Sequence, residues 1–309
     1  MKTLYNSLKI AAGVLIMSAL AVSCLPEQQS IGDAGQTLVK LNPSEFTLVP
    51  FDAKSASQTG VLFEVRRDVH SQAALNSTTS VVLTYDTNGA LLAAYNAENG
   101  TNFIPLPTNL GTTTPAVSGS TVTLDFAPGE FAKSILVTVP NATNFDFTKQ
   151  YALAYTLTSV SGTGTISENS GTTIVAQVLV KNKYDGKYKA TGYFTHPSSP
   201  RAIDMDKPMG TGGSNVITGG YADLGGSGYK YVITIDESSN LTVPGVTQRC
   251  YRVTMANLPT GAGFIYYNTT DDGTMKNYCY EHKPGKWTFV LFSGYSTGTR
   301  KAEETLVMY

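Results

Sequence analysis

The chain has 309 residues, nearly balanced charge (22 Lys and Arg against 23 Asp and Glu) and three cysteines. This balance argues against the strongly basic surface of nucleic-acid-binding proteins, so we expect no nucleic-acid partner. Glycine is abundant, threonine, valine and tyrosine are frequent, and long amphipathic helical patterns are nearly absent. The composition is typical of an all-β protein that is long enough for two domains.

The first 23 residues have the pattern of an export signal. Two lysines, Lys2 and Lys9, precede an apolar stretch over residues 10–22. Ser23 and Cys24 follow this stretch. A membrane-spanning helix needs roughly 20 apolar residues, so this stretch is too short to be one. A positive start followed by a short apolar middle predicts a cleaved signal peptide over residues 1–23.

Cys24 resembles the lipidated cysteine of bacterial lipoprotein signals, with residues 20–24 as the lipobox. The match has one departure, because Ala21 stands where leucine is usual. Acylation would anchor the protein to a membrane, since each buried methylene contributes ~0.8 kcal/mol. Ordinary cleavage with Cys24 as a free thiol is the alternative. Residues 24–37 are polar after Leu25 and lack periodicity, so they are predicted to form a flexible tether.

The first predicted domain covers residues 38–182. Short β-branched runs alternate there with turn residues, which favours a sandwich of two antiparallel sheets. The clearest predicted strands are Val61–Val65, Ser80–Tyr85, Val122–Phe126, Ile135–Val139, Tyr151–Thr158 and Thr173–Val180. One short helix is predicted over residues 89–99, with Asn88 as its cap and Gly100 as its end.

The segment around this helix resembles a known domain. Residues 95–103 (YNAENGTNF), followed by IPLP at 104–107, are similar to the signature of the domain of unknown function 1735. This family, the BT_3987-like N-terminal domain, stands at the front of many Bacteroidetes surface lipoproteins. FAPGE at 126–130 and YAL at 151–153 extend the similarity over residues 38–181. The resemblance implies an Ig-like β-sandwich in a protein encoded among polysaccharide-utilisation genes.

The second predicted domain covers residues 183–309 and begins with YDGKY at 184–188. Its predicted strands are Lys187–Phe194, Tyr229–Ile235, Tyr251–Met255, Phe264–Tyr267, Lys286–Phe292 and Glu304–Met308. Gly-rich turns at 210–215 and 225–228 and short connections favour an antiparallel meander, either a small barrel or a second sandwich. YDGKY and the closing residues 300–306 are similar to lipocalin-like domains that follow the first domain in this family.

No assembled catalytic motif is present. The three histidines lack the paired spacing of a zinc hydrolase, and the glycine-rich loop at 210–215 lacks the lysine of a phosphate-binding loop. Asp204 and Asp206 are interpreted as a solvated turn. Carboxylates for glycoside hydrolysis meet only in three dimensions, so a small glycoside hydrolase remains an alternative. We predict no metal, no cofactor and no enzymatic activity.

Aromatic side chains concentrate in the second domain. Flat rings with polar edges bind sugars by stacking and hydrogen bonding, although tyrosines in strands are also ordinary sheet packing. The candidate ligand-binding residues are Tyr266, Tyr267, Tyr278, Tyr280, Trp287 and Tyr295. Tyr266 and Tyr267 are adjacent and must point to opposite faces of a strand, so we expect at least one exposed aromatic side chain.

Cys250 and Cys279 are the two cysteines besides Cys24. In an exported protein they could form a disulfide, which would close a loop of about 30 residues and contribute ~3.5 kcal/mol. Two buried free thiols are the alternative, and the sequence favours neither.

These features predict a non-catalytic outer-membrane lipoprotein with an accessory role in binding polysaccharide or oligosaccharide. Its expected partners are the membrane, through the lipid, and other outer-membrane glycan-uptake proteins. The cell surface is the expected location, but only one acidic residue, Glu27, follows Cys24 closely, so the periplasmic face stays open. The alternative function is a structural or adhesin-like module that contacts a protein partner.

Overall fold

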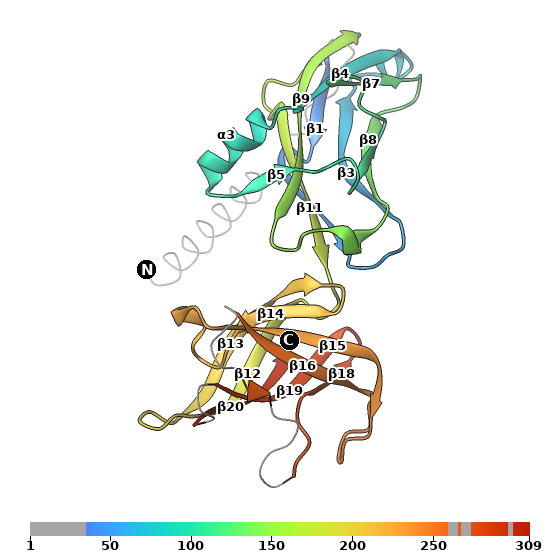
Figure 1. Cartoon of the computed structure of the whole chain (residues 1–309). Coiled ribbons are helices and arrows are strands. Elements are labelled where there is room, and N and C mark those ends of the chain that lie inside the picture. Colours follow the sequence, from blue (N-terminus) through green and yellow to red (C-terminus); the bar gives the residue numbers. More distant parts are fainter. Residues whose placement is uncertain (1–34, 259–264, 267–272, 296–298) are drawn as a thin grey trace, which may run out of the picture.

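The computed structural model describes residues 35–258, 265–266, 273–295 and 299–309, in two β units that follow one another along the chain (Figure 1). The predicted signal peptide, Cys24 and the tether up to residue 34 lie outside the described residues. Within the described ranges, no helix is long and apolar enough to cross a membrane.

The N-terminal unit consists of two packed sheets. The first has the order β10-β1-β3-β8-β6 and comprises β1 (Thr37–Asn42), β3 (Gln58–Asp68), β6 (Thr112–Thr114), β8 (Ala132–Val139) and β10 (Gly164–Ile166). The second has the order β2-β11-β9-β4-β7 and comprises β2 (Glu45–Asp52), β4 (Thr79–Tyr85), β7 (Thr121–Phe126), β9 (Gln150–Gly162) and β11 (Thr173–Lys181). A short strand, β5 (Phe103–Pro105), pairs with β9. The predicted sandwich is confirmed.

The sequence predicted two antiparallel sheets, but part of the strand pairing in this unit is parallel. The pairs β1–β10, β2–β11 and β5–β9 are parallel. Parallel partners must be joined by crossover connections, so they lie far apart in the sequence, where the local pattern carries no signal of their pairing. β1 begins at Thr37, one residue before the predicted start of the domain, and Thr37 is fully buried.

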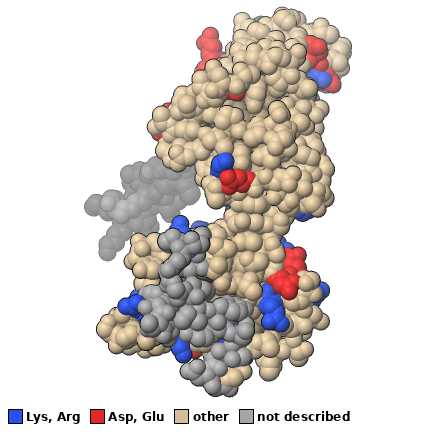
Figure 2. Space-filling view, viewed as in Figure 1, with Lys and Arg blue, Asp and Glu red and all other residues tan. Residues whose placement is uncertain are grey.

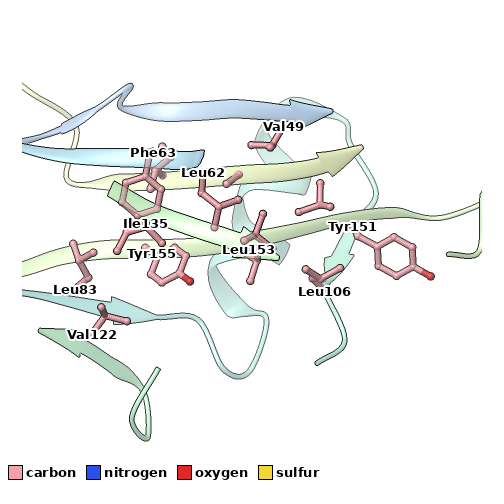
Figure 3. Packing of buried hydrophobic residues seen from close by; sticks show 14 of the residues in the cluster. Val49, Leu62, Phe63, Leu83, Leu106, Val122, Ile135, Tyr151, Leu153 and Tyr155 are labelled. Atoms are coloured by element: carbon pink, nitrogen blue, oxygen red, sulfur yellow. The ribbon is translucent and has the colours of Figure 1, made fainter. Parts of the chain in front are cut away.

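The core of this unit lies between its two sheets, as Figure 3 shows for one part of it. Alternate side chains of each strand point inward, which is why Val81 and Leu83 of β4 are both fully buried. Phe63 of β3 and Tyr155 of β9 meet across the sheets with ring centroids 5.3 Å apart (Figure 3). The period-2 pattern of the sequence therefore fixes which face of each strand is buried.

The predicted helix is present as α3 (Ala90–Asn99). The carboxylate of Asp86 accepts from the amides of Ala90, Leu91 and Leu92, and the Asn88 side chain accepts only from the first of these. Asp86 is thus the main cap, where the sequence predicted Asn88. Gly100 ends the helix in the left-handed region, at φ 64°, as predicted. A four-residue helix, α2 (Gln72–Leu75), and the 3-10 turn η1 (Ala142–Asn144) were not predicted, whereas the 3-10 turn η2 (Gly225–Ser227) falls in the predicted turn at 225–228.

The YNAENGTNF motif has a structural role. The Asn96 side chain donates to the carbonyl of Phe103 and accepts from the amide of Phe103, both at 2.9 Å, and it also accepts from the Thr101 hydroxyl. These bonds hold the end of α3 against β5. The Phe103 ring then packs against both Phe46 and Tyr95, which also stack on each other. The motif is therefore a helix-to-strand corner.

The FAPGE segment is organised by a buried arginine of β3. Arg67 is 2% exposed and lies over the Phe126 ring. Its guanidinium donates to four backbone carbonyls and one hydroxyl, those of Leu75, Ser77, Ala127, Glu130 and Thr79. A single side chain thus joins the end of α2 to the turn after β7.

The C-terminal unit is a closed antiparallel β-barrel. Its strands are β12 (Gly186–Thr195), β13 (Arg201–Gly213), β14 (Val216–Gly220), β15 (Lys230–Leu241), β16 (Cys250–Leu258), β18 (Tyr278–Lys283), β19 (Lys286–Tyr295) and β20 (Arg300–Met308). Each pairs with the next along the chain, and β20 pairs with β12 to close the ring. β17 (Ile265–Tyr266) adds to β19 outside this ring. Of the two predicted alternatives, the barrel is the one that forms.

Three strands of the barrel were not predicted: β13, β14 and β18. Asp204 and Asp206 lie on the outer face of β13 rather than in a loop, and Lys189 of β12 forms an ion pair with Asp204. The predicted glycine-rich turn at 210–215 begins inside β13, which continues to Gly213. Glycines and charged residues on the exposed face of a strand give it the sequence composition of a turn, because only the inward-facing residues of such a strand are apolar.

The barrel interior is filled by side chains. Tyr184, Tyr188 and Phe289 are fully buried there, and Tyr184 meets Trp287 at 4.5 Å between ring centroids. The YDGKY motif contributes to this packing and also fixes the entry of the chain, because Asp185 accepts from the amide and hydroxyl of Thr211 in β13.

Candidate ligand-binding site

Trp287, the central residue of the predicted aromatic platform, is an interior residue of the barrel. It is 3% exposed and packs against Tyr184 and Tyr251. Trp287, Phe289 and Leu291 occupy alternate positions of β19 and are all buried, so the alternation directs the indole inward. Its contacts are those of core packing.

Tyr278 and Tyr280 lie on the opposite, outer face of the sheet, in β18. Their rings are stacked at 6.3 Å and pack with Cys250 and Val243 beside the β15–β16 connection. Tyr278 is buried and Tyr280 is half-buried. The three described aromatic candidates are thus divided between two faces of the barrel wall.

The other three candidates cannot be placed as side chains. The backbone of Tyr266 pairs with Ser293, and Tyr295 ends β19, but their side chains and the whole of Tyr267 lie outside the described residues. A ligand-binding role for the aromatic residues therefore stays a prediction.

Cys250 and Cys279 are both buried free thiols. In the β16–β18 register Cys250 faces Tyr280 and Cys279 faces Tyr251, so the two cysteines occupy neighbouring, out-of-phase positions. Cys279 belongs to the interior cluster and Cys250 to the cluster on the outer face. A disulfide requires both side chains to point toward each other, which this register does not allow.

We expect the two thiols to behave as reduced, protected cysteines. In a Cys24→Ser chain, denaturation without reductant followed by alkylation should add two alkyl groups, and reductant should not change the mass. The native protein should react slowly, because burial raises the pKa of both thiols and the thiolate is the reactive form. A mass that rises only after reduction would contradict the free thiols.

The barrel wall parts between β13 and β14. The two strands pair only where residues 210–213 meet residues 216–218. From Arg201 to Met209, β13 pairs with β12 alone. Along these residues its other edge has no neighbouring strand paired with it among the described residues. A pocket of about 460 Å³ lies at this parting. It is the candidate site.

Glycine backbone forms much of the pocket. Its lining includes Gly219 and Gly220 at the end of β14, and Gly225 and Gly226 of the turn η2. A Cβ atom on Gly220 would lie 3.0 Å from the Cα atom of Gly225, and one on Gly219 would overlap the Met209 side chain. The turn can therefore lie close to the strand because Gly220 and Gly225 both lack a side chain, and backbone atoms of the glycines line the pocket.

A buried ion pair lies behind this lining. Lys207 of β13, which lines the pocket, and Glu304 of β20 are each 3% exposed as side chains, and the ammonium donates to Oε1 of the carboxylate. The second oxygen, Oε2, accepts from the amide of Ala222 at 3.2 Å. Burial raises the pKa of Glu304, and the attraction of Lys207 opposes that rise.

Tyr231 completes this interior polar group. Its side chain is 1% exposed, and the Lys207 ammonium lies 5.7 Å from the centre of its ring. The Tyr231 hydroxyl makes no hydrogen bond to any part of the chain that the structure describes. Burial raises the pKa of this phenol well above its usual value, so it stays protonated and retains one donor and an acceptor.

Arg201 and Asp223 hold the turn over the pocket in place. The Arg201 guanidinium makes a two-fold contact with the Asp223 carboxylate, with Nη2 2.8 Å from Oδ1. This bond holds the pKa of Asp223 below its usual value. Figure 2 shows that, among the described residues on the face in view, charged side chains form small scattered groups.

The sequence prediction missed this site, although it contained a signal. Residues 203, 205, 207 and 209 share one face of β13 and read Ile, Met, Lys and Met. A lysine in phase with apolar residues indicates a buried charge. The same holds for Glu304, which is in phase with Ala302, Leu306 and Met308.

Comparison with known proteins places the first unit in a family. Residues 41–164 match a family model described as a "-like, N-terminal domain". The first unit of this chain belongs to that domain family. The match includes the YNAENGTNF segment and confirms the expected resemblance. No curated protein matches the chain.

Two solved structures with a similar fold come from Bacteroides. An auxiliary nutrient binding protein from Bacteroides thetaiotaomicron has a TM-score of 0.51 and 12% identity, over 85% of this chain and 90% of that one. A protein of unknown function from Bacteroides ovatus has a TM-score of 0.50 and 12% identity, over 91% of this chain and 92% of that one. At this identity the similarity concerns the fold, and its extent covers most of both units.

Proposed function

We propose that this protein is a non-catalytic binding protein that holds a polysaccharide or oligosaccharide in the pocket between β13 and β14. The observation that carries the proposal is the parted barrel wall, with its pocket of about 460 Å³. Small-molecule sites typically measure about 300–1,000 Å³. Exposed peptide groups and the charged rim supply hydrogen-bond donors and acceptors for sugar hydroxyls. The nutrient-binding name of one structure with this fold is compatible with the proposal.

We further propose that Cys24 is lipidated and anchors the protein in the outer membrane, with the body at the cell surface. The apolar segment before Cys24 supports this location, and the polar residues after it would serve as a tether. Other outer-membrane glycan-uptake proteins are the proposed partners. Protease treatment of intact cells tests the orientation, because only a surface-exposed body is degraded.

A substitution that fills the pocket tests glycan binding. Gly226 is exposed, lines the pocket and has open space around its Cα atom, so Gly226→Trp should fold and occupy the site. Affinity electrophoresis against a polysaccharide panel should show retardation of the unaltered protein. Gly226→Trp should weaken that binding at least tenfold.

Thr191→Trp is the matched control. Thr191 is exposed on the outer face of β12 and is absent from the pocket lining, so the added ring should leave binding unchanged. Equal retardation of all three proteins would place the site elsewhere. Absence of retardation on every glycan, or release of chromophore from a chromogenic glycoside, would contradict the proposed function.

One observation favours a second candidate, a protein-interaction module. The edge of β13 that faces the parting has no ladder partner over residues 201–209 within the described structure. Such an edge can accept an extended strand from another protein. Co-purification of a defined partner that Gly226→Trp disrupts, without any dependence on sugar, would favour this function over glycan binding.

A further inference from the structure

The pocket contains a buried cation whose hydrogen-bonding capacity is only partly used. Lys207 carries three N–H donors, and Glu304 is its one hydrogen-bond acceptor in the described part of the chain. The adjacent Tyr231 ring offers only its face, and the Tyr231 hydroxyl makes no hydrogen bond there. Buried donors without acceptors are energetically costly. The interior end of the pocket therefore favours an oxygen-rich ligand group.

A second cation stands at the rim. Lys230, the first residue of β15, lines the pocket and is exposed, and it forms no ion pair with the described residues. The rim carboxylate is Asp206, which lies opposite Lys189 in the β12–β13 register, and Lys189 forms its ion pair with Asp204. Lys207 is neutralised by Glu304, so Lys230 is the cation of the lining that is both exposed and without an ion pair to the described residues.

We infer that the pocket binds an acidic sugar, with the carboxylate of a uronic acid accepting hydrogen bonds from Lys230 at the rim and from the unused donors of Lys207. This inference rests on the proposed glycan function and names the substrate class of the same site. A carboxylate supplies two strong acceptors and a negative charge that can pair with Lys230. A neutral sugar would satisfy part of the donors and leave the charge of Lys230 unpaired.

Pairs of polymers that differ only in charge test the inference. Polygalacturonate, alginate and hyaluronan are each compared with their carboxyl-esterified forms in binding to the full chain. At least one acidic polymer should bind ten times more tightly than its ester, and this preference should shrink as salt is raised from 20 to 500 mM, because salt screens exposed charges.

Lys230→Gln supplies the test at the residue level. It should weaken binding of the acidic polymer about tenfold and leave binding of the ester unchanged. Lys283→Gln, which removes an exposed lysine of β18 outside the pocket, should change neither. Equal melting temperatures of the three proteins would confirm that the fold is intact.

Two results would overturn the inference, and they differ in what else they affect. Equal affinity for acid and ester, blocked by Gly226→Trp and insensitive to Lys230→Gln, would reject the acidic sugar and keep a glycan site at the pocket. Lack of binding to every acidic and neutral polymer would reject the inference together with the proposed function.

Discussion

Replacement of Arg67 by methionine is expected to lower the free energy of unfolding of the N-terminal unit by about 3–5 kcal/mol. Each hydrogen bond to a charged group contributes roughly 1.5–3 kcal/mol, and the substitution removes five of them while keeping an apolar chain of similar length. Part of this loss is recovered because the Ala127 and Ser77 segments reach water. Hydrogen exchange of β3 and β8 peptides in the full chain, measured across a urea series, reports this unit separately from the barrel.

Arg66→Met is the control for that substitution. Arg66 is the neighbouring residue, and its side chain is 42% exposed and pairs with Glu64 at the surface. Surface ion pairs contribute about 0–1 kcal/mol, so the change should be small. A similar loss for both variants would show that Arg67 has no special role. Arg67→Lys should recover only part of the stability, because one ammonium has three donors and cannot reach all five acceptors on the two segments.

The sequence predicts the fold better than it predicts the site, for a physical reason. Burial of alternate residues is local, so runs such as Ser80–Tyr85 identify a strand and its inner face without knowledge of its partner. Pairing is not local. The parallel pairs of the sandwich depend on which distant strand lies alongside, and the parting between β13 and β14 depends on where the two paired strands diverge; no short pattern encodes either.

The aromatic residues show the same limit. Their clustering in sequence suggested one platform, but the register of β18 and β19 sends Trp287 inward and Tyr278 and Tyr280 outward. The cysteines differ in the same way, since a shift of one residue in the β16–β18 register would bring them onto one face. Charged residues in phase with apolar ones, such as Lys207, were the more informative pattern, because burial of an ammonium needs a specific partner.

Removal of one member of the Lys207–Glu304 pair is expected to be far more damaging than removal of both. Lys207→Met leaves a carboxylate buried without its cation, and such changes cost about 3–5 kcal/mol. Glu304→Leu should cost a similar amount by isolating the ammonium. The double variant Lys207→Met with Glu304→Leu replaces the pair by apolar side chains, and its stability should lie within about 1 kcal/mol of the unaltered protein or above it. Urea unfolding followed by hydrogen exchange of β13 and β20 measures all four proteins.

The pH dependence of Lys207→Met distinguishes the loss of charge pairing from simple loss of packing. Burial already raises the pKa of Glu304 above its ordinary value, and removal of Lys207 takes away the attraction that opposes the rise. A carboxyl whose pKa is higher in the folded state binds its proton more tightly when folded. Its stabilising effect is therefore present at low pH and is lost as pH increases through the folded pKa. The destabilisation caused by Lys207→Met should accordingly be smaller at pH 5 than at pH 8. A loss that is equal at both values, or a double variant whose cost is the sum of the single costs, would show that the two residues act independently and that the interior of the barrel tolerates each charge alone.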